Sequence, residues 1–198
     1  MSLFIPTYFS PISQYAEIAN SAEIIFEMED NFQKQSYRNR CYIYNSNGKL
    51  LLNIPVKNPE TQGRKKTKEM LIENNFPWQD QHFKSLQSSY RVSPYFEYFE
   101  DDLLPIFTKK YKFLHDVTID TYLFIVDALE LNPNFSKTAT YELEKVDNDF
   151  RFLADKNHQP SKDFKNYKQL FDDKHGFLSN LSILDLLFME GPNAVSYF

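Results

Sequence analysis

The densest group of side chains that could do chemistry lies in the first quarter of the sequence. Glu27 and Glu29 are two residues apart, directly after the apolar run 24–26, and on an extended strand they would point the same way. They follow the carboxyl end of a predicted strand, which is the edge where open α/β sheets bind ligands. Either carboxylate is therefore a candidate general base that takes a proton from an attacking group.

A basic and amide-rich segment follows at residues 33–40. If this segment is extended, its cations lie on one face together with Ser36, and two guanidinium groups on one face can bind a carboxylate or phosphate bidentately. The alternative is a solvent-facing strand with ordinary ion pairs. On the functional interpretation, substrate is bound by Lys34, Gln35, Tyr37, Arg38, Asn39 and Arg40.

His82 is the third candidate catalytic residue, because the ordinary pKa of histidine lies near neutrality. Trp78 is four residues earlier and would share a helix face with it, so Trp78, like Tyr37, could stack on a substrate ring. The alternative for His82 is a histidine at the edge of the core, bonded to a backbone group.

Strong stand-alone motifs are missing from the sequence. It has no glycine-rich phosphate loop, no paired cysteines, no His-Glu-x-x-His and no nucleophile elbow, and it contains only 4 Gly. None of the four histidines is at short spacing to another histidine or to Cys41. We therefore predict no metal site, and no particular cofactor is indicated.

The polar stretch 57–69 has two interpretations. It carries five basic and two acidic residues, including Arg64, Lys65, Lys66 and Lys68, and lacks apolar periodicity. It is either a solvated loop or a lid that meets a phosphate.

The elements that must position these residues are predicted from periodicity and turn residues. Strands near 3–5 and 24–26, with a helix beginning at Ser10-Pro11 between them, predict a βαβ-like start. Asn47-Gly48 between two strand-like runs predicts a β-hairpin. Helices are predicted from Trp78, from an N-cap at Ser93, over 116–131, and from an N-cap at Ser182, where Asp185 would complete a capping box.

These elements define an α/β fold: a small mixed sheet with several packed helices, with α+β as the alternative. Pro105 is expected to kink or end the second of these helices. Residues 132–165 are polar and are expected to be extended or irregular, with one strand near Thr140 to Leu143.

Composition sets the class of protein. The 198 residues suit a single domain spanning 1–198, with 42% hydrophobic residues for its core. A single cysteine, no signal peptide and no apolar stretch long enough to span a bilayer predict a cytoplasmic protein without membrane insertion. The net charge of −5 lies in the second half, which argues against nucleic acid as the main partner.

Several motifs, in order along the chain, resemble the WbqC-like protein family. The first group is Tyr8-Phe9-Ser10-Pro11, Lys34-Gln35-Ser36-Tyr37-Arg38-Asn39-Arg40 and Leu52-Asn53-Ile54-Pro55-Val56. The second group is Trp78 with His82, Ser93-Pro94-Tyr95-Phe96, Tyr167-x-Gln169 and Leu181-Ser182-Ile183-Leu184-Asp185-Leu186-Leu187, followed by Gly191-Pro192. Many relatives start with His-Gln-Pro where this chain has Phe4-Ile5-Pro6, so a mechanism that uses that histidine would not apply here.

The resemblance implies a bacterial protein of surface polysaccharide (O-antigen) biosynthesis. The implied activity is an acyl or aminoacyl transferase, possibly glycyl, acting on a nucleotide- or lipid-linked amino sugar. Tyr8 is added to the substrate-binding residues on this ground. The alternative is a non-catalytic sugar- or protein-binding component of an envelope pathway. In both cases the partner is a small molecule or a sugar, and the oligomeric state is left open.

Overall fold

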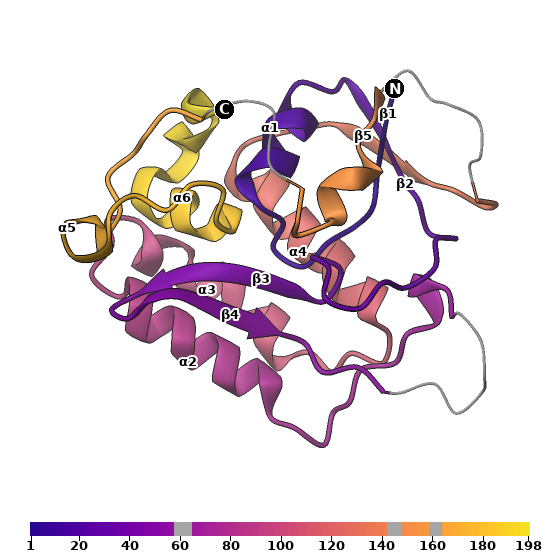
Figure 1. Cartoon of the computed structure of the whole chain (residues 1–198), viewed down its shortest axis with the longest axis horizontal. Helices are drawn as coiled ribbons and strands as arrows, with labels where there is room; N and C mark the ends of the chain where they lie inside the picture. The colour runs from indigo at the N-terminus through magenta and orange to yellow at the C-terminus, as the bar shows by residue number, and fades with distance from the viewer. Residues whose placement is uncertain (58–64, 142–147, 159–163) are drawn as a thin grey trace.

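A computed structural model describes residues 1–57, 65–141, 148–158 and 164–198 (Figure 1). The chain begins with the expected βαβ unit: β1 (Ser2–Phe4), α1 (Ile12–Ala19) and β2 (Glu23–Phe26). The two strands are parallel, with Leu3 opposite Ile25. Leu3, Phe4, Ile24 and Phe26 are all buried, so burial of apolar side chains drives this pairing.

Two strands from late in the chain complete the first sheet. β5 (Asn134–Lys137) pairs with β2, and β6 (Asn148–Asp149) pairs with β1, both in parallel. The strand order is β5-β2-β1-β6. The strand expected near Thr140 to Leu143 does not include Thr140 or Tyr141, and positions 142–143 lie outside the described residues; β5 lies earlier, at 134–137.

The predicted hairpin is confirmed as β3 (Arg40–Asn45) and β4 (Gly48–Asn53). Asn45 pairs with Gly48 across the turn, and Gly48 has a φ of 101°, which side chains disfavour. The hairpin forms a sheet of its own that lies alongside α2 (Trp78–Tyr90) (Figure 1). The α/β fold class is confirmed, with the parallel and antiparallel strands placed in two sheets.

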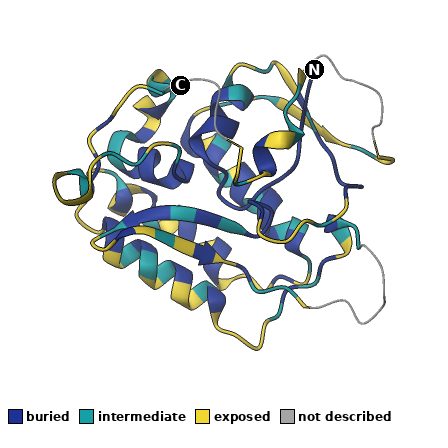
Figure 2. Ribbon diagram, viewed as in Figure 1, coloured by how far each residue is buried: buried dark blue, intermediate teal, exposed yellow. Residues whose placement is uncertain are grey.

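The remaining helices surround these sheets. In addition to α2 they are η1 (Thr67–Glu69), α3 (Phe96–Thr108), α4 (Leu114–Ala128), η2 (Arg151–Ala154), α5 (Asp172–His175), α6 (Ile183–Glu190) and η3 (Gly191–Tyr197). The predicted buried face of α2, made by Trp78, His82, Leu86 and Tyr90, is confirmed. Figure 2 shows the same separation into a buried and an exposed face along the outer helices. None of the helices in the described part of the chain is long and apolar enough to cross a bilayer.

Two predicted helix starts are wrong because the serine hydroxyl has another partner, and of the two effects expected of Pro105, the end of the helix is wrong. Pro11, not Ser10, is the N-cap of α1, while the Ser10 hydroxyl bonds to Thr7. The Ser93 hydroxyl donates to the Tyr90 carbonyl, so it closes α2 instead of starting α3. Pro105 lies inside α3, which continues to Thr108.

The predicted boundaries of α6 are confirmed. The amide of Leu184 donates to the Ser182 hydroxyl at 3.3 Å, as an N-cap requires. Gly191 ends the helix with a φ of 58°, and a Cβ there would lie 2.6 Å from the Tyr95 ring. This position therefore requires glycine for both its backbone conformation and its packing.

The capping-box role of Asp185 is wrong. Its carboxylate is turned into the core, where it is 1% exposed and accepts hydrogen bonds from Tyr90 (2.6 Å), Tyr167 (2.6 Å) and Gln169 (2.9 Å). Burial raises the pKa of Asp185, against the opposing effect of these three donors. The carboxylate thus ties α6 to α2 and to the segment before α5.

Candidate functional site

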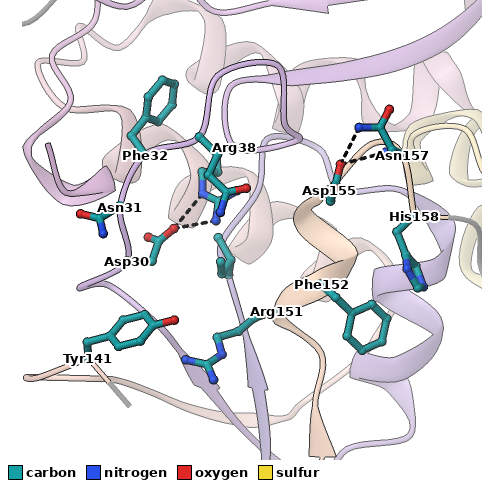
Figure 3. A pocket seen from close by; sticks show the side chains of 12 residues that line it. Asp30, Asn31, Phe32, Arg38, Tyr141, Arg151, Phe152, Asp155, Asn157 and His158 are labelled. Carbon is teal, nitrogen blue, oxygen red and sulfur yellow. Dashed lines mark hydrogen bonds and ion pairs between the residues drawn. The ribbon is translucent and has the colours of Figure 1, made fainter. Parts of the chain in front are cut away.

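The candidate site is a pocket of about 860 Å³ at the carboxyl edge of the parallel sheet (Figure 3). Because the four strands are parallel, their carboxyl ends meet at this edge. The pocket is lined by Ile5 just beyond β1, Asp30 beyond β2, Tyr141 beyond β5 and Arg151 beyond β6. The edge that sequence analysis singled out is therefore where the structure has its pocket.

A buried ion pair between Asp30 and Arg38 forms one wall. Arg38 donates from Nε (2.8 Å) and Nη2 (2.6 Å) to the same oxygen, Oδ2 of Asp30. The two residues are only 4% and 2% exposed, and Nη1 of Arg38 donates to the Ser36 hydroxyl at 3.1 Å. The other Asp30 oxygen, Oδ1, is buried and has no hydrogen-bond partner among the described residues.

Asp30 is a buried acid in the wall of the pocket. Burial raises its pKa, against the opposing effects of Arg38 and Thr67. A carboxylate with one oxygen held by an arginine and the other unbonded keeps a fixed orientation and can still accept a proton. Asp30 is therefore suited to general-base chemistry.

Arg151 forms the facing wall and is held by two carboxylates. Its Nη2 is 2.6 Å from Oδ2 of Asp149 and its Nη1 is 3.5 Å from Oε2 of Glu27. The Tyr141 ring lies 5.2 Å from the guanidinium carbon, within cation–π range. Figure 3 shows Arg151 and Tyr141 across the pocket from Arg38.

Glu27 lies behind this wall. It is fully buried, and its Oε1 accepts hydrogen bonds from the Glu29 amide (2.9 Å) and the Thr138 hydroxyl (2.8 Å). It does not line the pocket itself. Glu27 therefore affects the pocket indirectly, by holding the Arg151 guanidinium that lines it.

Amide and aromatic groups complete the lining. Asn31, Gln33 and Asn157 add amides, and the rings of Phe152 and His158 lie 4.5 Å apart. Asp155 accepts from the amide and side chain of Asn157 (2.9 and 3.1 Å). Rings beside hydrogen-bonding groups are the chemistry that a polar ring such as a sugar needs.

The predicted alternation of residues 33–40 is wrong. These residues form turns until β3 begins at Arg40, and Gln35 has a φ of 61°. Lys34 and Gln35 are exposed, whereas Gln33 and Arg38 are the residues of this segment that line the pocket. The expected strand does not form, because the segment folds back and brings the Arg38 guanidinium into contact with the Asp30 carboxylate.

Three neighbours of Arg38 do not line the pocket. Asn39 donates from Nδ2 to the Ile54 carbonyl at 2.9 Å, which holds the end of β4. Tyr37 is buried, and burial raises its pKa to about 12. Arg40 is half-buried, and its Nε has no hydrogen-bond partner among the described residues.

Glu29 is held by the basic segment 65–69. Its carboxylate pairs with both Lys66 and Lys68, and these hydrogen bonds lower its pKa. Glu27 and Glu29 therefore bind different partners. Arg64 of the predicted lid lies outside the described residues.

His82, Trp78 and Tyr8 come together, but in the core and not in the pocket. Nδ1 of His82 is 3.0 Å from the Tyr8 hydroxyl, and the Trp78 ring centroid is 5.4 Å from the imidazole. All three residues are buried and none lines the pocket. Burial lowers the pKa of His82 to about 4, against the opposing effect of the Asn53 backbone. At neutral pH His82 is therefore an uncharged core residue.

This pKa predicts an acid-sensitive stability. The pKa of His82 is about 4 in the folded protein and has its ordinary value of 6.5 in the unfolded chain. Between these pH values the unfolded chain binds a proton at His82 and the folded protein does not. The free energy of unfolding is therefore highest above about pH 6.5 and falls as the pH drops towards 4. The loss is on the order of 3 kcal/mol for a shift of this size. Urea unfolding from pH 7 to pH 4 should show a shallower fall for His82→Gln than for wild type. Tyr8→Phe, which keeps the titrating group, should retain the wild-type fall, and equal slopes for all three proteins would reject the assignment.

Sequence analysis missed most of the pocket. Asp30 directly follows Glu29 but is not among the predicted site residues. Arg151 lies in the polar region 132–165, which has no apolar periodicity. Among the described residues, no group of three or more His, Cys, Asp or Glu side chains could hold a metal ion. The position of Asp30 after an apolar strand was the one signal that could have identified it.

The fold and the pocket define an α/β protein with a polar pocket at the carboxyl edge of its parallel sheet. The sequence pattern of the WbqC-like protein family matches residues 6–156, which include Asp30, Arg38 and Arg151, and the chain belongs to this family. The resembling segments at 167–169 and 181–192 lie beyond that match. No curated protein and no solved structure matches the chain.

Proposed function

We propose that this protein is a transferase that moves an acyl or aminoacyl group onto the amine of a nucleotide- or lipid-linked amino sugar in surface polysaccharide biosynthesis. The observation that carries the proposal is the Asp30 carboxylate, buried in the pocket wall with Oδ1 unbonded. Membership of the WbqC-like family supports the same pathway.

The pocket suits an amino sugar. Amides and carboxylates can bind ring hydroxyls, and Phe152 and Tyr141 can pack against the apolar face of a ring. The Asp30 carboxylate is the group that would hold the amine: Arg38 binds its Oδ2, and its buried Oδ1 has no hydrogen-bond partner among the described residues.

The reaction then follows from the role of Asp30. As the amine nitrogen attacks the acyl carbonyl of an activated ester or thioester, a carbon–nitrogen bond forms and Asp30 accepts the proton from nitrogen. When the bond to the leaving group breaks, that group receives the proton. Arg38 fixes the Asp30 orientation, and Glu27 positions Arg151.

This assignment moves the base from the predicted His82, Glu27 or Glu29 to Asp30; Glu27 accepts hydrogen bonds from the Glu29 amide and Thr138 and does not line the pocket. His82 makes its hydrogen bond in the core, and Glu29 is paired with two lysines. Of the predicted substrate-binding residues, Arg38 keeps a direct place in the pocket. Contacts of substrate with Lys34, Gln35, Tyr37, Asn39, Arg40, Trp78 and Tyr8 stay predictions.

A ligand screen tests the proposal. Nucleotide-linked amino sugars, neutral nucleotide sugars, amino acids and nucleotides are compared by thermal shift, where a ligand at a hundred times its Kd stabilises by about 2.7 kcal/mol. We expect amino sugars to stabilise more than matched sugars that carry a hydroxyl in place of the amine. Mass spectrometry with activated acyl donors should then show an amide product.

The outcomes separate the two predicted functions. Stabilisation by amino sugars without product from any donor would reject the transferase and favour the non-catalytic binding component. Equal stabilisation by the amine and hydroxyl sugars would contradict the role of Asp30 as the amine-binding group.

A further inference from the structure

A second hollow of about 470 Å³ lies next to the pocket and is not used by the proposed reaction. Its cations are Lys68, Lys112 and Lys137, and its apolar surface comes from Met28, Leu71 and Phe113. We call it the lysine hollow. Glu69 and His115 complete its lining.

Backbone pairing brings these residues together from four parts of the chain. Lys137 is the last residue of β5, opposite Phe26 of β2, and Met28 follows β2. Leu71 forms a β-bridge with Phe113, and the Ile72 amide donates to the Lys112 carbonyl at 3.0 Å. The positions of the three lysines are therefore set by η1, by the end of β5 and by the segment before α4.

The lining of the lysine hollow carries three lysines and one carboxylate, Glu69, so it has an excess of positive charge. Lys112 and Lys137 are exposed and form no ion pair with any described residue. The Lys112 ammonium lies 5.2 Å from the Phe113 ring centroid, over the hollow's apolar surface. Lys68 pairs with Glu29, and the Glu69 carboxylate accepts a hydrogen bond from the Lys66 backbone amide. Two free ammonium groups and a third nearby favour an anion with several oxygens.

One wall separates the lysine hollow from the pocket. Met28 faces the hollow and Asp30 faces the pocket, two residues apart in the segment after β2. The segment 65–69 runs beside it, since the Thr67 amide donates to the Asp30 carbonyl at 2.9 Å and the Phe32 amide to the Lys65 carbonyl at 2.9 Å. The segment after β2 and the segment 65–69 therefore form the boundary between the pocket and the lysine hollow.

We propose that the lysine hollow binds the phosphate or diphosphate group of the carrier to which the amino sugar is linked. The identity of the carrier rests on the proposed function, whereas the site itself rests on the three lysines. The apolar surface formed by Met28, Leu71 and Phe113 contacts the part of the carrier next to its phosphate. Such a site does not need the bidentate guanidinium of arginine, because the lysine ammonium group binds phosphate as a point charge.

Titration calorimetry with inorganic pyrophosphate and with uridine diphosphate tests the site. Sedimentation with vesicles of equal parts phosphatidylcholine and phosphatidic acid tests a lipid-borne phosphate. We expect the double variant Lys112→Gln, Lys137→Gln to weaken binding of the responding probe by at least about tenfold, since hydrogen bonds to charged groups are strong. Added salt should weaken wild-type binding as well.

A charge-matched variant provides the control. Lys84→Gln, Lys174→Gln removes two exposed lysines from α2 and α5, and its affinity should stay within about twofold of wild type. Binding of pyrophosphate or uridine diphosphate would assign a soluble carrier, and binding of the vesicles alone a lipid carrier. Failure of all three probes to bind, or equal loss of affinity in the two double variants, would overturn the site.

The readout needs no turnover, so it is independent of the transferase. Lysine-dependent phosphate binding without product would support the phosphate site in the lysine hollow and reject the proposed transferase reaction. Product formation without lysine-dependent phosphate binding would reject the hollow and keep the reaction.

Discussion

Asp30→Asn is expected to lower the turnover number by about 10² to 10⁴ fold, the usual contribution of a general base. The amide has nearly the shape of the carboxylate and can still accept a hydrogen bond from Arg38, but it cannot take a proton from the substrate amine. Binding of the amino sugar should also weaken, because the charge that attracts its amine is lost, but by less than turnover falls, because proton transfer occurs only in the transition state. Steady-state kinetics together with thermal shift would measure the two effects separately.

Stability must be measured in the same experiment, because the substitution leaves the buried Arg38 without its counter-charge. Arg38 is 2% exposed, and breaking a buried pair can cost several kcal/mol. Asp80→Asn, a surface change on α2, controls for the chemistry of the substitution. His82→Ala tests the sequence-based alternative: if that variant folds and loses turnover while Asp30→Asn remains active, the base is His82 and the pocket assignment is wrong.

Asp185→Leu is expected to destabilise the fold by about 3 kcal/mol or more. The substitution leaves the hydroxyls of Tyr90 and Tyr167 and the amide of Gln169 buried without their shared acceptor, and each unsatisfied group costs about 1 to 3 kcal/mol. Tyr90→Phe and Tyr167→Phe remove one donor each, so each should cost about 1 kcal/mol. Urea unfolding at pH 7 measures all three.

The same change at an exposed aspartate provides the control. The Asp173 side chain is 92% exposed, and Asp173→Leu should change stability by no more than about 0.5 kcal/mol. Unchanged stability of Asp185→Leu with lost ligand binding would show that the buried carboxylate belongs to a second functional site.

Sequence analysis predicted the fold better than the site, for a physical reason. The βαβ start, the hairpin and the apolar face of α2 each depend on local periodicity or on turn residues such as Asn47-Gly48, and all three are confirmed. The helix starts at Ser10 and Ser93 failed because their hydroxyls found other acceptors or donors in the folded chain. Local rules cannot rank such competing partners.

The candidate site depends on contacts between distant segments. The edge beyond β2 was predicted correctly, yet the choice among Glu27, Glu29 and Asp30 is decided by residues far away in sequence. Thr138 and Arg151 hold Glu27, the lysines of 65–69 hold Glu29, and the fold-back of 31–39 brings Arg38 to Asp30. Residue type and spacing carry no information on these pairings, so the expected alternation of residues 33–40 failed with them.

The strand order β5-β2-β1-β6 also determines when this protein can fold. During synthesis the β1–β2 pair is complete early, but both of its flanks stay open until residues 134–149 leave the ribosome. Open strand edges pair readily with other chains, and closing a sheet over so long a sequence separation is slow. The nascent chain is therefore most vulnerable to aggregation in the interval before its sheet-edge strands arrive, and the walls of the pocket contributed by Tyr141 and Arg151 form only when that interval ends.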